Sequence, residues 1–326
     1  MRGFHLYVLA AAALLALVLA GRMNQYWMHV AIIAMFYAIL ASSWSLLAGY
    51  AGLFSLGHMA FASVGGYTSA LLVKWLAIPI PLGMAAGVTM CFLLGALIGF
   101  VCLRMSGPYL AIFTLGFAEI VRITFSTEDD VTAGMAGLHT EPLFNAVSRL
   151  PYFYTAFGLL ALALALMGAL ARSRWGLFLR AIREDEQAAA ASGIAVARFR
   201  ILVFAIASGF AGLAGGFYAH YIGILTPSLG GLDLMALLVV MTVIGGMERL
   251  PTAVGGAVAV EFLLELLREY GQWRLPIFGV ILLLTMRFAR NGLLTPIWLQ
   301  FVRLGEPQLA VATVPAPEVE GKDQRA

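Results

Sequence analysis

Ten apolar segments run through the chain, and this pattern limits the possible fold more than any other feature. A helix needs about 20 predominantly apolar residues to cross a lipid bilayer. With 62% hydrophobic and 11% charged residues, the 326-residue chain is also far less polar than an average soluble domain. We therefore expect an all-α, polytopic membrane protein with about ten transmembrane helices. The segments lie near residues 4–21, 28–48, 53–73, 82–103, 108–125, 152–171, 199–221, 232–247, 252–270 and 276–288.

The two ends of the chain carry separate expectations. Arg2 precedes an apolar run that ends in small residues around Ala20, which is also typical of a secretory signal. Because nine further segments follow, we expect this first segment to stay as an uncleaved helix. Residues 1–304 then form one transmembrane domain. The tail 305–326 is rich in Pro, Val, Ala and Glu without periodicity and is predicted to be disordered.

Basic residues gather on alternate sides of the predicted spans. If the N-terminus is cytoplasmic, most of the 20 Lys and Arg residues fall in cytoplasmic connections or in the tail. Positive charge favours the cytoplasmic side of a membrane. The bias thus predicts that both termini are cytoplasmic.

A polar interval, residues 172–200, separates two apolar blocks and carries six arginines. Its centre, Arg180 to Ser192, lacks Pro and Gly and is rich in Ala, so we expect one helix that ends with a left-handed cap at Gly193. Ile182, Ala189 and Gly193 would share one narrow stripe of this helix. The interval is either a solvated loop or a docking helix for a soluble partner.

The span from Gly49 to Leu72 is dense in Gly, Ala and Ser. Such small residues allow helices to approach closely in a membrane. His58 within this span needs a hydrogen-bond partner or a wet cavity. A structural hydrogen bond and direct contact with a substrate are both open, and we favour the first.

These residues also form a pattern that resembles the LivM-type permease subunit of branched-chain amino acid ABC transporters. The resemblance covers about residues 28–295. It rests on Gly49-x-x-Gly52-x-x-Ser55-Leu56-Gly57-His58-x-Ala60-Phe61, Gly65-x-Tyr67-Thr68, Gly107-Pro108-Tyr109-x-Ala111, Thr114-Leu115, Glu119-Ile120-x-Arg122, Thr132-x-Gly134-x-x-Gly137-Leu138, Gly176, Arg180-Ala181-Ile182-Arg183-Glu184-Asp185, Gly193-Ile194, Gly245-Gly246 and Arg290-x-Gly292-Leu293.

The resemblance implies that the polar interval is a cytoplasmic coupling helix for an ATPase. Gln187-Ala188-Ala189 followed by Gly193 is similar to the EAA motif of ABC permeases, with glutamine in place of glutamate. The implied coupling residues are Gly176, Arg180, Ile182, Arg183, Glu184, Asp185, Gln187, Ala188, Ala189 and Gly193. The implied residues of the translocation path or its gates are Ser55, Gly57, His58, Gly65, Tyr67, Thr68, Tyr109, Thr114, Glu119, Arg122, Thr132, Gly134 and Gly137.

The resemblance further implies a multi-pass protein of the bacterial inner membrane that imports branched-chain amino acids. The implied partners are a LivH-type second permease, LivG-type and LivF-type ATPases that bind ATP and Mg, and a periplasmic binding protein. Leu53, Ala133 and Met135 depart from the usual glutamine, glycine and serine of the pattern. These departures leave urea, short amides and aromatic acids open as substrates.

The chain itself shows no pattern for catalysis. Neither of its two lysines, Lys74 and Lys322, lies in a phosphate-binding G-x-x-x-x-G-K-[ST] loop, and no Cys/His cluster has zinc spacing. We expect no enzyme activity, no cofactor and no metal in this chain, and energy from partner ATPases.

Two other function classes stay open. An ion-gradient transporter would carry acidic residues at membrane depth. Glu119 is better explained by an i,i+3 ion pair with Arg122. Glu261 shares one helix face with Glu265 and keeps the ion-gradient alternative open. A structural membrane protein is the third class. The acidic outer loop 126–151 either receives the binding protein or is a plain connector.

Overall fold

The computed structural model describes residues 23–296, apart from 106, 147, 274–275, 281–282, 284–286, 288–291 and 293. The predicted first segment and the tail 305–326 lie outside the described residues, as do parts of the last segment. The described elements are almost all helical. In chain order they are α2 (Gln25–Trp44), the π-helix η1 (Ser45–Tyr50), α3 (His58–Leu76), α4 (Ile80–Val101), η2 (Cys102–Arg104), α5 (Pro108–Thr127), α6 (Asp129–Thr132), η3 (Gly134–Ala136), β1 (Leu138–His139), α7 (Leu150–Arg172), α8 (Arg174–Glu184), α9 (Glu186–Ala191), α10 (Val196–Ile222), β2 (Ile224–Leu225), η4 (Pro227–Gly230), α11 (Leu232–Gly245), α12 (Leu250–Leu266) and η5 (Leu267–Trp273).

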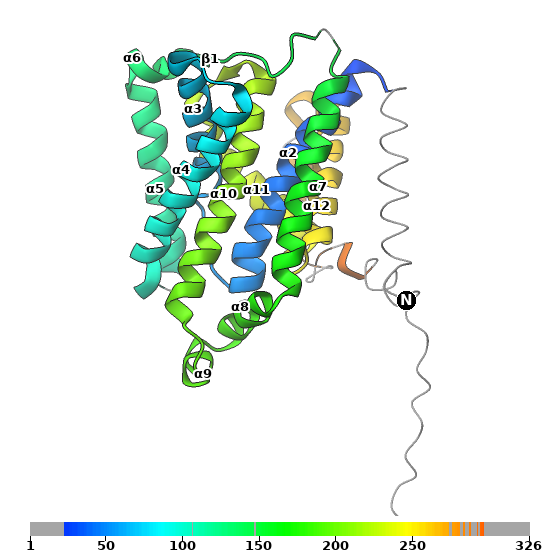
Figure 1. The fold of residues 1–326 in the computed structure, drawn as a ribbon. Helices are drawn as coiled ribbons and strands as arrows, with labels where there is room; N and C mark the ends of the chain where they lie inside the picture. The colour runs from blue at the N-terminus through cyan, green and yellow to red at the C-terminus, as the bar shows by residue number, and fades with distance from the viewer. Residues whose placement is uncertain are drawn as a thin grey trace, which may run out of the picture.

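The long helices run alternately up and down between two ends of a bundle (Figure 1). One end, here the α8 end, holds α8, α9 and the turn from α4 to α5. The opposite end, here the β1 end, holds α6 and the short strand β1. There β1 pairs antiparallel with β2, with Leu138 opposite Leu225 and His139 opposite Ile224. The ladder fastens the loop after α5 to the connection between α10 and α11.

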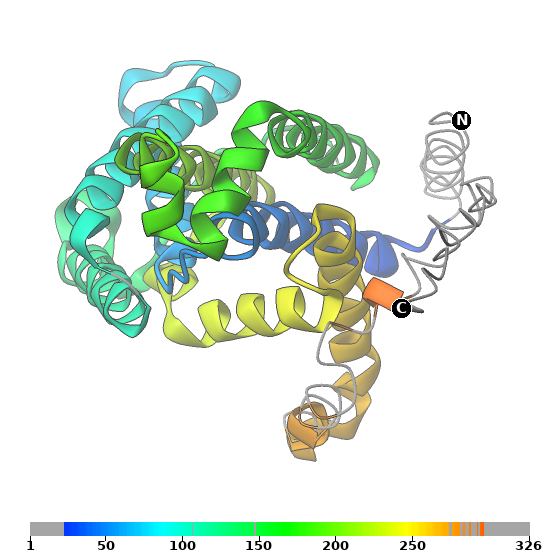
Figure 2. The same ribbon diagram turned by 90° about the horizontal axis from the view of Figure 1, so that it is seen from below.

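The core lies around α2, which is apolar on all sides. In the apolar window of α2 and η1, 89% of residues are buried, against 17% in α5. Seen from below, α2 lies near the middle, with α7, α11 and α12 around it and α4 and α5 farther out (Figure 2). A helix that is hydrophobic on all sides belongs in a core or in a membrane. The exposed leucine, isoleucine and phenylalanine side chains of α4, α5 and α7 fit a lipid-facing surface.

Three helices, α3, α4 and α10, are held together at glycines. A Cβ added at Gly65 of α3 would overlap the main chain of Gly212 on α10, and one at Gly87 of α4 would meet the carbonyl oxygen of Gly65 at 2.6 Å. Only hydrogen fits at these positions. The expected close approach at the glycine-rich span is therefore confirmed, and Gly65 is one of its close contacts.

The number of spans is only partly resolved by the structure. Among the described residues, six helices are long and apolar enough to cross a membrane: α2 with η1, α4, α5, α7, α10 and α12 with η5. Two further predicted segments form helices, α3 of 19 residues and α11 of 14 residues, that fall short of these criteria. The predicted total of about ten stays a prediction.

Candidate functional site

The first feature of the site is a break between α2 and α3. After η1 the chain leaves helical geometry, returns into the bundle and starts α3 at His58 (Figure 1). Non-helical backbone at membrane depth needs hydrogen-bond partners inside the protein. Leu53 N donates to the carbonyl oxygen of Leu47 at 3.1 Å, and Trp44 Nε1 donates to that of Ser55 at 2.8 Å. Hydrogen bonds within the protein thus hold the backbone of this break in place.

Four of the predicted path residues meet at this break. The Ser55 hydroxyl accepts from Gly57 N at 3.2 Å, and the buried Thr114 hydroxyl of α5 accepts from Leu56 N at 2.9 Å. A Cβ on Gly57 would lie 3.1 Å from the Thr114 carbonyl oxygen. His58 is 1% exposed, and its Nε2 lies 2.8 Å from the Ser43 hydroxyl. The favoured structural hydrogen bond of His58 is therefore present.

A second break, residues 246–249 between α11 and α12, packs against the first. The Ser45 hydroxyl of η1 donates to the carbonyl oxygen of Met247 at 2.6 Å. A Cβ added at Gly49 would overlap this same carbonyl group. Gly246 has a φ of 115°, which side chains other than hydrogen rarely allow. Two non-helical turns, one between η1 and α3 and one between α11 and α12, thus contact each other next to the α8 end.

The polar interval forms two short helices, so the expectation of one helix from Arg180 to Ser192 is wrong. Asp185 has extended backbone angles between α8 and α9. Its carboxylate accepts from Gln187 N and Ala188 N, both at 2.9 Å, and so caps the start of α9. The left-handed cap at Gly193 is confirmed, with a φ of 84°. Asp185 as an N-cap outweighs the helix propensity of its neighbours.

The expected stripe of Ile182, Ala189 and Gly193 does not form, because the break rotates α9 relative to α8. Ile182 and Ala189 are buried within this chain, whereas Gly193 is exposed. Gly176 sits against the carbonyl group of Ala171 in the tight turn from α7 to α8. The outward surface of the interval is formed instead by other residues, among them Arg180, Glu184, Asp185, Gln187 and Ala188.

Arg183 connects α8 to both breaks. Its Nη1 donates to the carbonyl oxygen of Gly49 at the end of η1, and its Nη2 donates to Glu248 Oε1 at 2.6 Å. Gly52 packs against its aliphatic carbons, since a Cβ there would lie 3.1 Å from Arg183 Cγ. One helical turn earlier, the Arg180 guanidinium lies 4.9 Å from the centre of the Tyr50 ring. Arg180 and Arg183, which the resemblance assigned to the coupling helix, therefore connect α8 to the first break.

Arg200 makes a second connection, which the sequence did not indicate. This residue of α10 is 6% exposed and lies within hydrogen-bond distance of both carboxylate oxygens of Glu186 on α9, at 2.9 and 3.0 Å. It also donates to the carbonyl oxygen of Met105 at 2.7 Å, in the turn between α4 and α5. A buried arginine needs such partners. An arginine close to the start of an apolar helix was the signal in the sequence that could have indicated this connection.

The remaining predicted path residues are dispersed. Tyr67 is buried on α3 and donates to the carbonyl oxygen of Leu225 at 3.2 Å, while Thr68 beside it is half-buried. On α5, Tyr109 is 75% exposed. Glu119 and Arg122 form the expected ion pair on the same helix, with Arg122 Nε donating to Glu119 Oε2 at 2.9 Å. None of these five residues has a side-chain hydrogen bond to the first break.

The loop motif that contains Thr132, Gly134 and Gly137 has a structural explanation. The buried Thr132 hydroxyl is 2.8 Å from the carbonyl oxygen of Phe125 and closes the end of α5. Gly134 and Gly137 have positive φ angles, and each leaves no room for a side chain. Gly137 packs against Ile224 of β2. The motif therefore shapes the β1 end of the bundle.

Comparison with known proteins decides what this arrangement belongs to. The family model for the branched-chain amino acid transport system permease component matches residues 26–289. The chain belongs to this family. The permease is 29% identical to the high-affinity branched-chain amino acid transport permease LivM of Escherichia coli strain K12, over 88% of this chain and 74% of the relative. It is 26% identical to a probable LivM of Methanocaldococcus jannaschii, over 62% of this chain and 64% of that protein.

Relatives with another named solute also match the permease. It is 28% identical to the autoinducer 2 import permease LsrC of Salmonella paratyphi B, over 68% of this chain and 57% of the relative. No solved structure matches. The transport role of the permease thus rests on the family and on its membrane-spanning helices, while its solute needs a separate argument.

Proposed function

We propose that this permease is the membrane subunit of an ATP-driven, binding-protein-dependent importer of branched-chain amino acids. The family match and the LivM relatives support this solute class. A homologous second permease, two cytoplasmic ATPases and a periplasmic binding protein complete the importer. The α8 end faces the cytoplasm, where the arginines of residues 172–200 fit the positive-inside rule. Both termini are cytoplasmic in this orientation.

The observation that carries the mechanism is the double contact of Arg183. A displacement of α8 by an ATPase acts directly on Gly49 and Glu248, because one guanidinium binds both. These residues end η1 and lie in the turn before α12, so the displacement reaches the turns of two helix pairs at once. The backbone of such a turn can rearrange without breaking the hydrogen-bond ladder of a helix. The glycine crossings beyond them allow sliding between helices.

The ATPases dock on the exposed surface of α8 and α9, which includes Glu184, Gln187 and Ala188. Ala188→Trp places a large side chain on this surface without filling the core. We expect the ATPases to dissociate during purification of this variant and uptake to stop. Ala146→Trp, an exposed residue of the loop between β1 and α7, is the matched control and retains both. Normal co-purification and uptake with Ala188→Trp contradict docking at this surface.

The solute is tested by uptake in cells that lack the chromosomal copy of the gene. Labelled leucine, isoleucine and valine should enter only when the permease is restored together with its partner subunits. The LsrC relatives support a second candidate, an importer of the same design for a polar, non-amino-acid solute. Restored uptake of autoinducer 2 without uptake of any branched-chain amino acid favours this second candidate.

A further inference from the structure

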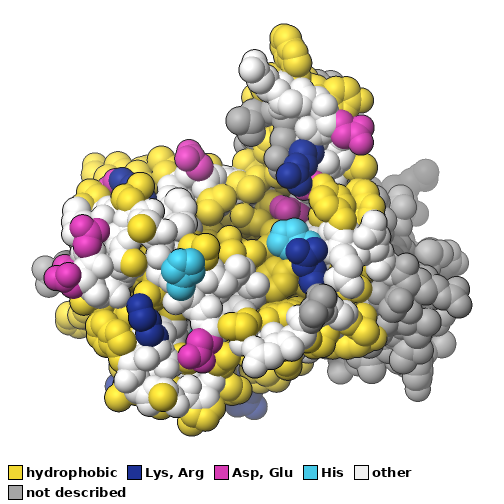
Figure 3. Space-filling view, turned by 90° about the horizontal axis from the view of Figure 1, so that it is seen from above, with side chains coloured by type: hydrophobic (Ala, Val, Ile, Leu, Met, Phe, Trp, Pro, Cys, Tyr) yellow, Lys and Arg dark blue, Asp and Glu magenta, His cyan; other side chains and the backbone are white. Residues whose placement is uncertain are grey.

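A polar cavity opens at the β1 end between α2, α10 and α12, outside the site described above. Its volume is about 260 Å³. Viewed from above, the surface is hollowed there, and histidine, arginine and acidic side chains gather around an otherwise apolar depression (Figure 3). Ligand pockets of drug size begin at about 300 Å³, so the cavity suits a smaller solute.

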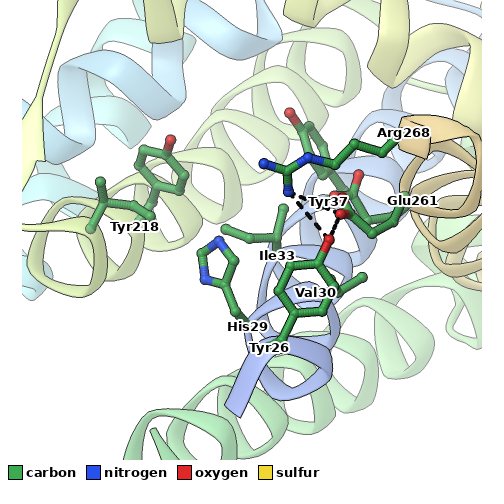
Figure 4. A pocket seen from close by; sticks show the side chains of 10 residues that line it. Tyr26, His29, Val30, Ile33, Tyr37, Tyr218, Glu261 and Arg268 are labelled. Atoms are coloured by element: carbon green, nitrogen blue, oxygen red, sulfur yellow. Dashed lines mark hydrogen bonds and ion pairs between the residues drawn. The ribbon is translucent and has the colours of Figure 1, made fainter. Parts of the chain in front are cut away.

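Oppositely charged side chains that contact each other lie at the opening of the cavity. Arg268 Nη1 on η5 lies 3.0 Å from Glu265 Oε1 of α12 and donates to the Tyr26 hydroxyl at 3.2 Å, and the Tyr26 hydroxyl donates to Glu265. Both of these Arg268 contacts use Nη1, and its guanidinium extends from η5 over the cavity (Figure 4). A guanidinium presents five N–H donors in a planar fork that suits a carboxylate.

The interior of the cavity combines a carboxylate with apolar walls. Glu261 precedes Glu265 by one helical turn and lies deeper along α12, next to Tyr37 of α2 (Figure 4). Val30 and Ile33 of α2 and Ile222 of α10 supply the apolar surface. The lining thus has acceptors at depth, a cation at the mouth and aliphatic carbon between them.

We propose that this cavity binds a zwitterionic aliphatic amino acid at the outer end of the permease. The ammonium group binds the Glu261 side, the carboxylate binds the Arg268 guanidinium, and the aliphatic side chain packs on Val30 and Ile33. An anion without an ammonium group would face two carboxylates here, and a simple cation would lie beside Arg268. A zwitterion satisfies both signs of charge, which is why we choose it. The inference rests on the proposed function and adds to it an outer contact site.

Protection of an introduced thiol tests the site directly. Ile33→Cys is placed in a background with Cys91→Ala and Cys102→Ala, and membranes that contain the assembled importer are treated with an impermeant, charged thiol reagent. We expect leucine to slow this labelling. Its amine analogue 3-methylbutylamine and its acid analogue 4-methylpentanoate each keep one of the two charges and should need about tenfold higher concentration or more, because one charge-assisted contact is lost. Met135→Cys, exposed in η3 at the same end, should show no protection.

Charge-removing variants complete the test. Glu261→Gln and Arg268→Gln should each raise the half-protecting leucine concentration about tenfold, when protection is measured relative to each variant's own labelling rate without leucine. Asp233→Asn, an exposed acidic residue in the first turn of α11, is the matched control and keeps protection. If leucine is imported but does not protect Cys at position 33, the cavity proposal falls and the proposed function stands. Protection by the amine or the acid analogue at the same concentration as leucine also overturns the cavity proposal.

Discussion

Arg183 on α8 and Glu248 in the turn between α11 and α12 form an ion pair of 2.6 Å, although 65 residues separate them in the sequence. The same guanidinium donates to the main chain of Gly49. Exposed ion pairs contribute little to stability on their own, and Glu248 is 64% exposed. The contact therefore adds little to the stability of the fold, but it joins the polar interval to the non-helical turns that follow η1 and α11.

The crossing of Gly65 with Gly212 should be a sensitive point of the helix packing. A Cβ on Gly65 would overlap the main chain of Gly212, which cannot move aside as a side chain can. We expect Gly65→Ala to destabilise the permease by about 1–3 kcal/mol through overpacking. The fraction of permease that stays monodisperse in detergent after heating measures this loss.

Two comparison variants define the effect at Gly65. Gly158→Ala on α7, with no atom within 4 Å of its added Cβ, should resist heat at least as well as wild type, because alanine is the better helix former. Gly57→Ala should be intermediate, because its nearest contact is the Thr114 carbonyl oxygen at 3.1 Å. Equal heat resistance of all three variants would show that the glycine crossing does not limit packing.

Two alanines hold backbone angles that glycine adopts more readily. Ala133 and Ala77 have φ angles of 60° and 49°. The left-handed region costs an alanine about 1–2 kcal/mol relative to its usual conformation. Ala133→Gly and Ala77→Gly should each raise the free energy of unfolding by up to about 1 kcal/mol, once the entropy that glycine loses on folding is subtracted. The midpoint of thermal unfolding should rise accordingly. Ala136→Gly, in a residue without positive φ, should lower it, and the reverse order would contradict the argument.

The orientation can be tested with two single cysteines. Both native cysteines, Cys91 and Cys102, are buried and unbridged, so alanine can replace them. Met135→Cys and Ala195→Cys place exposed thiols at the β1 end and the α8 end respectively. An impermeant thiol reagent added to intact spheroplasts should label position 135 and not position 195. Position 195 should become labelled after lysis. The opposite pattern would place the polar interval outside.

Hydropathy was sufficient to predict the helices that the structure describes, because a membrane span must be apolar over its whole length. The cap at Gly193 and the Glu119–Arg122 pair were also predictable, since each depends on residues close in sequence or on one residue's backbone freedom. The small residues of the glycine-rich span predicted a close approach, although not the partner Gly212. The break at Asp185 was not predicted because a side-chain cap outweighed a favourable helix composition.

Contacts between distant segments were beyond sequence reasoning. The inward direction of Arg183 depends on Gly49 and Glu248, which only the folded bundle brings together. The cavity at the β1 end likewise combines side chains from three helices. The sequence did indicate that Glu261 and Glu265 share a face of one helix, and on α2 the four-residue spacing of His29, Ile33 and Tyr37 was a similar signal.

The coupling role of Arg183 is tested most directly by the number of leucine molecules imported per ATP hydrolysed in proteoliposomes that contain the complete importer and loaded binding protein. Arg183→Met keeps a long side chain and removes both contacts, while Arg174→Met changes an exposed arginine of the same helix as the control. We predict that the ATPases remain bound to Arg183→Met and hydrolyse ATP, while leucine import per ATP falls about tenfold or more and stays normal in Arg174→Met. An unchanged import ratio in Arg183→Met would contradict the coupling of α8 to the turns that follow η1 and α11.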